Sequence, residues 1–411
     1  MGYLRRRVVT AALTANAWRP VPGFRAGAYA FLPGWWAGEL APQLLAATVA
    51  DTAVAVVRRK ATLPGLALAG ATTVGLAAMI RRSRQVRVLV DGCIDHDLGA
   101  ELAADLDPIT PEELATPWSS LVTPFRRSDP RVRVDRDVRY SDAGKRGLLD
   151  IYRPLREVTG APVLIQVHGG GWVLGSKDEQ GIPLMNEMAA HGWVGVSINY
   201  RLANRDPWPA QIVDVKRAIA WVREHIADYG GDPSYVVITG GSAGGHLAAL
   251  AALTPNDPAF QPGFEEADTT IQAAVPVYGV YDIAGTTGSQ SAVWIRDHFF
   301  GPKVMRRTYA EAPEVYEAAS PLLRVTEDAP DFFVIHGASD TLVSPTHAHA
   351  LVARLREVSR RTVVFAELPG AQHAFDVFTS VRTVHVVRAV GRYLAWHHAR
   401  RRESAPQVRA S

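Results

Sequence analysis

The chain contains one cysteine, Cys93, in 411 residues. A single thiol can form neither an internal disulfide framework nor a multi-cysteine metal site, which excludes domains stabilised in either way. Hydrophobic residues make up 47% of the sequence and charged residues 21%, as is typical of a globular protein with enough apolar material for a core. The length favours one large domain, or one domain with a substantial extension.

Acidic residues are scarce near the N-terminus. Residues 1–90 contain twelve lysines and arginines but only Glu39 and Asp51, a net charge of +10, whereas the rest of the chain carries −7. Basic residues beside apolar segments favour an anionic lipid surface, and the alternative is a solvated basic tail. No nucleic-acid partner is expected, because long apolar runs interrupt the basic residues and no binding module is recognisable.

Charge is also missing from residues 61–80, ATLPGLALAGATTVGLAAMI, which basic residues flank on both sides. Twenty such residues are enough to cross a bilayer as a helix. Residues 39–57 are mostly apolar and predict an amphipathic or interfacial helix. We therefore predict that residues 1–90 form a basic, hydrophobic helical extension that contacts membrane lipid, in a membrane-associated or cell-envelope protein. The alternative is a helical hairpin packed on the catalytic domain of a cytoplasmic protein.

The rest of the chain divides by composition. Residues 91–130 are acidic and polar with a helix-start signal at Thr110, which predicts linker or cap helices. Residues 131–400 form the expected catalytic domain, and residues 401–411 are a basic and polar tail. Strand and helix patterns alternate in this domain, which predicts an α/β fold with a mostly parallel, doubly wound sheet and helices on both faces. We expect strands at 131–140, 147–152, 163–167, 194–200, 235–239, 271–278, 332–336 and 361–368, and helices at 181–191, 209–229, 246–253 and 381–401.

Glycines surround a serine at one predicted strand-to-helix turn. The stretch from Gly240 to Gly245, GGSAGG, follows the apolar run 235–239 and opens the next helix. A serine placed two residues from glycine on either side of such a turn is typical of the nucleophile elbow of α/β-hydrolases. There a strained backbone lifts the hydroxyl out of the turn. The pattern makes Ser242 the candidate nucleophile, and an ordinary glycine-rich turn is the alternative.

A second glycine cluster, HGGGW at residues 168–172, follows the predicted strand 163–167. The bare N–H groups of Gly169, Gly170 and Gly171 can crowd a developing negative charge. The N–H of Ala243, next after the nucleophile, would complete an oxyanion hole. A flexible loop is the alternative, but this cluster and the elbow occur together, each after a strand.

Four segments together resemble one family. HGGGW at 168–172, GGSAGG at 240–245, LDIYRP at 149–154 and NYRLA at 199–203 are similar to the hormone-sensitive-lipase and carboxylesterase-like branch of the α/β-hydrolases. The resemblance covers about residues 130–400 and is nearest to bacterial esterases with a hydrophobic N-terminal region; kynurenine formamidases carry a similar glycine-rich segment. The chain departs from the branch at Gly241, where aspartate or glutamate often precedes the serine.

The fold that this resemblance implies places its triad in the chain order serine, acid, histidine. Asp340 follows the strand 332–336, at the sheet edge where catalytic groups collect. Asp331 and Asp376 fit this position less well, and Glu367 is a second choice. His373 lies in the loop after the last predicted strand, and the order argument makes it the base.

The implied mechanism is hydrolysis of an acyl ester or lipid through an acyl-enzyme, with no metal or organic cofactor. Trp172 and Tyr278 are candidates for the substrate pocket, although large aromatic residues are more often core. The loops 256–270 and 284–300 are long enough to cap the site. An amide hydrolase of the formamidase or peptidase type, and a non-catalytic binding module on the same fold, are the alternatives.

Overall fold

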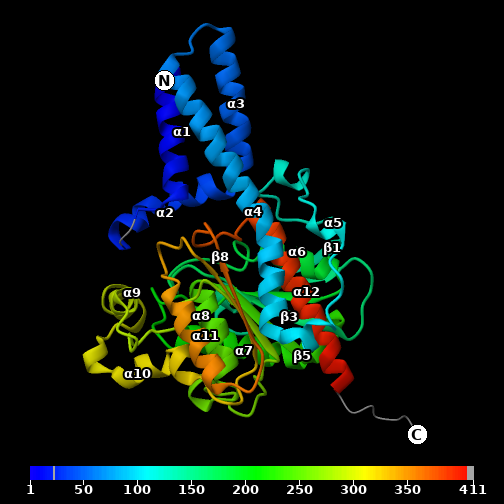
Figure 1. Ribbon diagram of the computed structural model, residues 1–411. Helices are drawn as coiled ribbons and strands as arrows, with labels where there is room; N and C mark the ends of the chain where they lie inside the picture. Colours follow the sequence, from blue (N-terminus) through cyan, green and yellow to red (C-terminus); the bar gives the residue numbers. More distant parts are fainter. Residues whose placement is uncertain (22–23, 405–411) are drawn as a thin grey trace.

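A helical stalk projects from a body that is built around one β-sheet (Figure 1). This computed structural model describes residues 1–21 and 24–404. The expected C-terminal tail therefore lies mostly outside the described residues, apart from its first four residues, which continue the last helix, α12 (Val381–Ser404).

The sheet has eight strands in the order β1-β2-β4-β3-β5-β6-β7-β8. The strand β2 runs antiparallel to both of its neighbours, and the other pairs are parallel. This confirms the predicted mostly parallel sheet. The strands are β1 (Val132–Arg139), β2 (Leu148–Pro154), β3 (Ala161–Val167), β4 (Val194–Ile198), β5 (Gly231–Gly241), β6 (Ala273–Val277), β7 (Asp331–Gly337) and β8 (Val363–Leu368).

Helices cover both faces of the sheet, as predicted. Successive side chains of a strand point to opposite faces, so an apolar strand contributes to a core on each side. In β3, Val163 and Ile165 join one apolar core, and Leu164 between them joins the other. The body helices are α5 (Pro111–Leu114), α6 (Ile182–Ala190), α7 (Ala210–His225), α8 (Ala243–Leu253), α9 (Gln290–Ile295), α10 (Pro313–Ala318), α11 (Thr346–Val358) and α12. The first core packs against α7, α8 and α11, and the second against α6, α12 and the long helix α4 (Leu63–Ala103).

One long helix, α4 (Leu63–Ala103), joins the stalk to the body. The expected boundary at residue 90 falls inside this helix and does not separate two structural units. The reason lies in the spacing of Val86, Val90, Ile94 and Leu98, which places an apolar stripe on one helix face and buries it in the second core. The shift to acidic residues therefore marks where α4 meets the sheet, not where the helix ends.

The stalk consists of α1 (Tyr3–Trp18), α3 (Ala41–Val57) and the first half of α4. Its helices are joined by specific contacts: the Trp18 indole N–H donates to the Gly75 carbonyl at 3.0 Å, and Asp51 accepts hydrogen bonds from Arg6 and Arg7. The stalk points away from the body (Figure 1), unlike the hairpin packed on the catalytic domain that was the alternative expectation.

By length and composition, α4 is the one helix among residues 1–21 and 24–404 that could cross a membrane. Residues 29–39 of α2 (Phe24–Glu39) together with α3 pass the same test as a pair bent by 78°. The predicted interfacial helix 39–57 thus corresponds to α3, and α2 ends at Glu39.

Candidate active site

The predicted nucleophile elbow lies at the centre of the sheet, where β5 ends and α8 begins. Ser242 has φ 59° and ψ −120°, a strained conformation for a residue with a side chain. Its N–H donates to the Val277 carbonyl of β6 at 3.0 Å, which holds the turn in place. Close packing requires glycine beside it, because a Cβ on Gly244 would lie 2.1 Å from the Val167 carbonyl oxygen.

The predicted acid and base are in contact. His373 Nδ1 lies 2.6 Å from Asp340 Oδ2, while Asp340 Oδ1 accepts the N–H groups of Leu342 and Val343 at 2.9 Å each. Burial alone would raise the pKa of Asp340, but His373 and His336 outweigh burial and hold this pKa well below its usual range. The carboxylate is therefore ionised and oriented toward the imidazole.

Gln372 is a site residue that sequence reasoning did not assign. Its side-chain oxygen accepts the N–H of Thr341 at 2.8 Å and the N–H of His373 at 2.9 Å. It thereby ties the loop that carries the acid to the loop that carries the base. Nothing in its local sequence distinguishes this role from that of any loop glutamine.

The glycine loop adopts backbone conformations that favour glycine. Gly170 has φ 111° and Gly171 has φ 59°, and both line the same pocket as Ser242. The expected donor Gly169 is different, because its N–H already donates to the Gln180 side chain at 2.7 Å. The Gly169 N–H is therefore paired within the protein, whereas Gly170 and Gly171 line the pocket.

The two aromatic candidates both line the pocket and are also buried. The Trp172 indole N–H donates to His246 Nδ1 at 3.1 Å, and His246 Nε2 is 2.8 Å from the Ala319 carbonyl. Burial lowers the pKa of His246 to about 4, so this histidine is neutral and structural.

Tyr278 explains the departure from the family pattern at Gly241. A Cβ on Gly241 would lie 2.6 Å from the Tyr278 hydroxyl oxygen, so a larger residue would displace this ring. The hydroxyl donates to Asp376, and the ring lies 4.7 Å from the His373 imidazole. Gly241 thus leaves room for a tyrosine that packs on the histidine.

One pocket of about 490 Å³ contains both Ser242 and His373. Ile295 and Phe299 of the loop 284–300 line it, as expected for a capping loop. The loop 256–270 instead lies against α7, where Lys216 Nζ donates to Thr269 Oγ1 at 3.2 Å. The other lining residues are Phe31, Gly170, Gly171, Trp172, Val173, Leu174, Gln180, Tyr278, Val280, Leu342, Val343 and Ala374.

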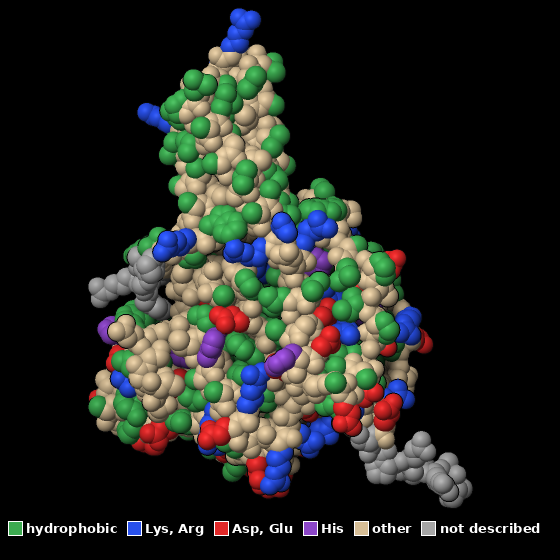
Figure 2. Space-filling model, viewed as in Figure 1, with side chains coloured by type: hydrophobic (Ala, Val, Ile, Leu, Met, Phe, Trp, Pro, Cys, Tyr) green, Lys and Arg blue, Asp and Glu red, His purple; other side chains and the backbone are tan. Residues whose placement is uncertain are grey.

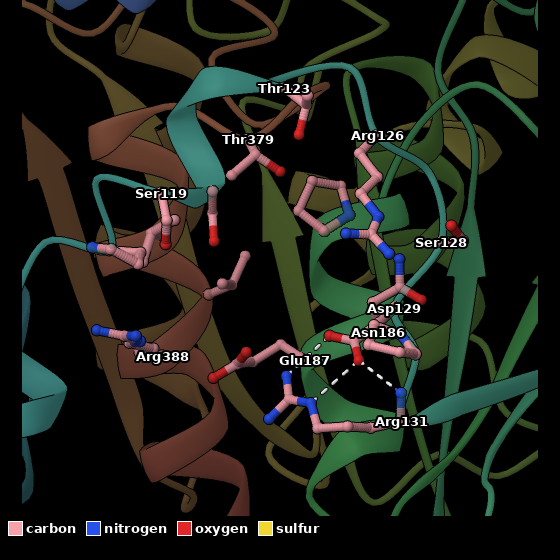
Figure 3. Close-up of a pocket in the computed structure, with 16 residues that line it drawn as sticks. Ser119, Thr123, Arg126, Ser128, Asp129, Arg131, Asn186, Glu187, Thr379 and Arg388 are labelled. Atoms are coloured by element: carbon pink, nitrogen blue, oxygen red, sulfur yellow. Dashed lines mark hydrogen bonds and ion pairs between the residues drawn. The ribbon is translucent and has the colours of Figure 1, made fainter.

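A second hollow, of about 370 Å³, lies between residues 117–131, α6 and α12 and is polar (Figure 3). It contains none of the residues of the elbow or of the His–Asp pair. Two of its arginines already have partners within the protein: Arg131 binds Asp129 at 2.8 Å, and Arg388 donates to the Glu113 carbonyl at 2.8 Å. The apolar pocket at Ser242 is therefore the candidate active site.

The elbow, the glycine loop and the His–Asp pair on this sheet define an α/β-hydrolase. The family described as BD-FAE matches residues 149–355. The chain is 42% identical over 410 residues to the probable carboxylic ester hydrolase LipM of Mycobacterium tuberculosis, covering 96% of this chain and 93% of that one. It is 51% identical over 268 residues to the esterase LipQ of the same organism, covering 64% and 63%.

Among solved structures, the propionate-bound esterase Est2 of Thermogutta terrifontis has a similar fold, with a TM-score of 0.53 and 23% identity over 66% of this chain and 94% of that one. The match to LipM extends through the stalk, because it covers nearly the whole chain. The protein belongs to the hormone-sensitive-lipase-like carboxylesterases and is a carboxylic ester hydrolase.

Proposed function

We propose that this protein hydrolyses apolar acyl esters with Ser242 as nucleophile, His373 as general base and Asp340 as the group that orients the base. The observation that carries the proposal is the shared pocket. Ser242 on its elbow and His373, held by an ionised Asp340, both line one cavity whose walls are largely apolar.

The assignment follows from hydrogen-bonding chemistry. An ionised carboxylate can only accept, so the proton of the imidazole lies on Nδ1 and points to Asp340. Nε2 is then free to take the Ser242 proton as the hydroxyl attacks the acyl carbonyl. The N–H groups of Gly170, Gly171 and Ala243 stabilise the oxyanion, a contribution of about 3 to 4 kcal/mol for each essential donor. Water then hydrolyses the acyl-enzyme by the same route.

An ester substrate is favoured over the amide substrates of formamidases by the charge of the pocket. Among its described lining residues there is no Lys, Arg, Asp or Glu. N-formylkynurenine carries an ammonium and a carboxylate, and burying either without a partner is costly. We expect kcat/KM for phenyl butyrate to exceed that for N-formylkynurenine by about a hundredfold or more, measured with the same purified enzyme. Faster hydrolysis of N-formylkynurenine would support the amide alternative.

The stalk is proposed to insert into a membrane. Only 28% of the most apolar 18-residue window of α4 is buried within the protein. Hydrophobic side chains are spread over the stalk surface, and lysine and arginine side chains lie at its tip, on one side below the tip and around its base (Figure 2). Several of the exposed hydrophobic residues of these helices are valine or leucine. Arg58, Arg59 and Lys60 form the tip, in the turn between α3 and α4. An apolar rod with charged ends suits a bilayer, and this supports a membrane-bound enzyme.

Two exposed valines of α4 provide a matched test of insertion. Val74 lies in the stalk and is 70% exposed, whereas Val88 lies in the body and is 65% exposed. Val74→Lys is expected to weaken retention on phospholipid vesicles, because a lysine at the centre of a membrane helix costs about 3 kcal/mol. Val88→Lys should leave retention unchanged. Flotation of both variants with vesicles measures this, and equal retention would contradict insertion of the stalk.

A further inference from the structure

The helix α2 lies across the foot of the stalk, beside the loops that carry the acid and the base (Figure 1). The Trp35 indole N–H donates at 2.8 Å to the carbonyl of Ala374, the residue after the base. The hydroxyl of Thr341, the residue after the acid, donates at 3.2 Å to the Gly27 carbonyl. One helix of the N-terminal extension therefore contacts both loops of the active site.

Phe31 brings α2 into the pocket itself. Its side chain is part of the pocket lining, and its ring meets the His373 imidazole edge-on with centroids 6.1 Å apart. Trp35, one turn later on the same helix face, stacks on Phe31 at 5.9 Å and packs on Phe378 at 5.3 Å. This inner face of α2 therefore forms one wall of the acyl pocket.

The outer face of α2 is also apolar but is exposed. Tyr29 is 87% exposed, and Leu32 and Trp36, spaced to lie on the same side of the helix, are exposed as well. Trp36 touches the exposed ring of Phe125 from the linker at 6.0 Å. A continuous exposed apolar surface of this kind marks a contact with membrane or protein.

Charge around α2 favours a lipid surface over a protein partner. The exposed residues Arg19, Arg81 and Arg84 lie where the stalk meets the body. In the same region the Arg82 guanidinium lies over the Trp18 ring, 4.2 Å from its centroid. Tryptophan and arginine together are typical of the headgroup level of a bilayer. The one acidic residue of α2, Glu39, is buried on Arg382 at 2.9 Å and does not repel anionic lipid.

We propose that α2 is a membrane-facing wall of the acyl pocket, and that the substrate is a long-chain acyl ester of a membrane lipid. The acyl chain passes from the bilayer along Phe31 to Ser242 and leaves the apolar phase at no point. The exposed Leu174 and the neighbouring Leu342 complete the apolar mouth of the pocket. This inference rests on the proposed ester hydrolysis and on insertion of the stalk.

The test uses full-length enzyme in phospholipid vesicles and two esters. Butyrate p-nitrophenyl ester is soluble and reaches the site from water, whereas the palmitate ester is dissolved in the vesicles. Phe31→Gln is expected to lower the palmitate-to-butyrate ratio of kcat/KM by about tenfold, because a polar wall disfavours the long chain. Val88→Gln, at an exposed position of the body outside the pocket and outside the apolar surface of α2, should change the ratio by less than about twofold.

A second measurement uses the unaltered enzyme. Palmitate ester placed in the same vesicles as the enzyme should be hydrolysed at least about ten times faster than ester placed in separate vesicles, since its chain does not leave the bilayer readily. An unchanged ratio in Phe31→Gln, or equal rates from both vesicle populations, would overturn the proposal. Loss of butyrate hydrolysis in the unaltered enzyme would instead overturn the proposed esterase activity, so the two failures are distinguishable.

Discussion

Ser242→Ala is expected to lower kcat/KM for p-nitrophenyl butyrate by about six orders of magnitude, because removal of a serine nucleophile leaves only the oxyanion donors and binding. The variant should also lose covalent labelling by a fluorophosphonate probe. Ser234→Ala is the matched control, since Ser234 lies exposed near the other end of the same strand, β5. Its activity and labelling should match those of the unaltered enzyme.

The labelling result also decides between an enzyme with this nucleophile and a binding module on the same fold. An adduct that maps to Ser242 agrees with the proposed role. Unchanged ester hydrolysis in Ser242→Ala would show that the nucleophile is another residue, and the strained elbow would need a different explanation.

Asp340→Asn is expected to lower kcat by about four orders of magnitude, because an amide no longer holds the imidazole proton on Nδ1. His373 and His336 hold the pKa of Asp340 below its usual range, so this side chain carries a charge that asparagine lacks. Measurement of kcat and of thermal stability together separates a loss of orientation from a loss of folding.

Asp376→Asn provides the comparison, since Asp376 is a half-buried carboxyl group three residues after the base. Burial raises the pKa of Asp376, and its partner is the Tyr278 hydroxyl rather than the imidazole. The amide of asparagine keeps an oxygen that can accept the Tyr278 hydroxyl, so kcat should fall by about tenfold at most. A larger fall of kcat in Asp376→Asn than in Asp340→Asn would show that Asp340 is not the acid of the triad.

The order and type of the main elements were predictable because the patterns that encode them are local. Strands β3, β5, β6 and β7 read as continuous apolar runs, which happens when both faces of a parallel strand are buried. The strand-turn-helix signature at Ser242 is equally local. Its glycines are needed because the turn packs closely on itself and on the neighbouring strand. Such features can be predicted from a few consecutive residues.

Other features depended on contacts between distant segments. The expected boundary at residue 90 lies inside α4, because composition changes there while the helical pattern continues. The N–H of Gly169 donates to Gln180, eleven residues later, and nothing in the glycine motif indicates this partner. The role of Gly241 became clear only when Tyr278 was seen to fill the space that a side chain would need.

The sequence by itself determined the hydrolase core and proposed its candidate triad, because a strand end, a tight turn and the chain order of Ser242, Asp340 and His373 are written in short motifs. Only the tertiary structure decided what surrounds them. Phe31 lies more than three hundred residues from His373 in the chain, and no local pattern pairs an apolar helix with a catalytic loop. Their contact arises because α4 joins the stalk to the body, so that Phe31 of the N-terminal helix α2 lies against His373 and lines the candidate pocket.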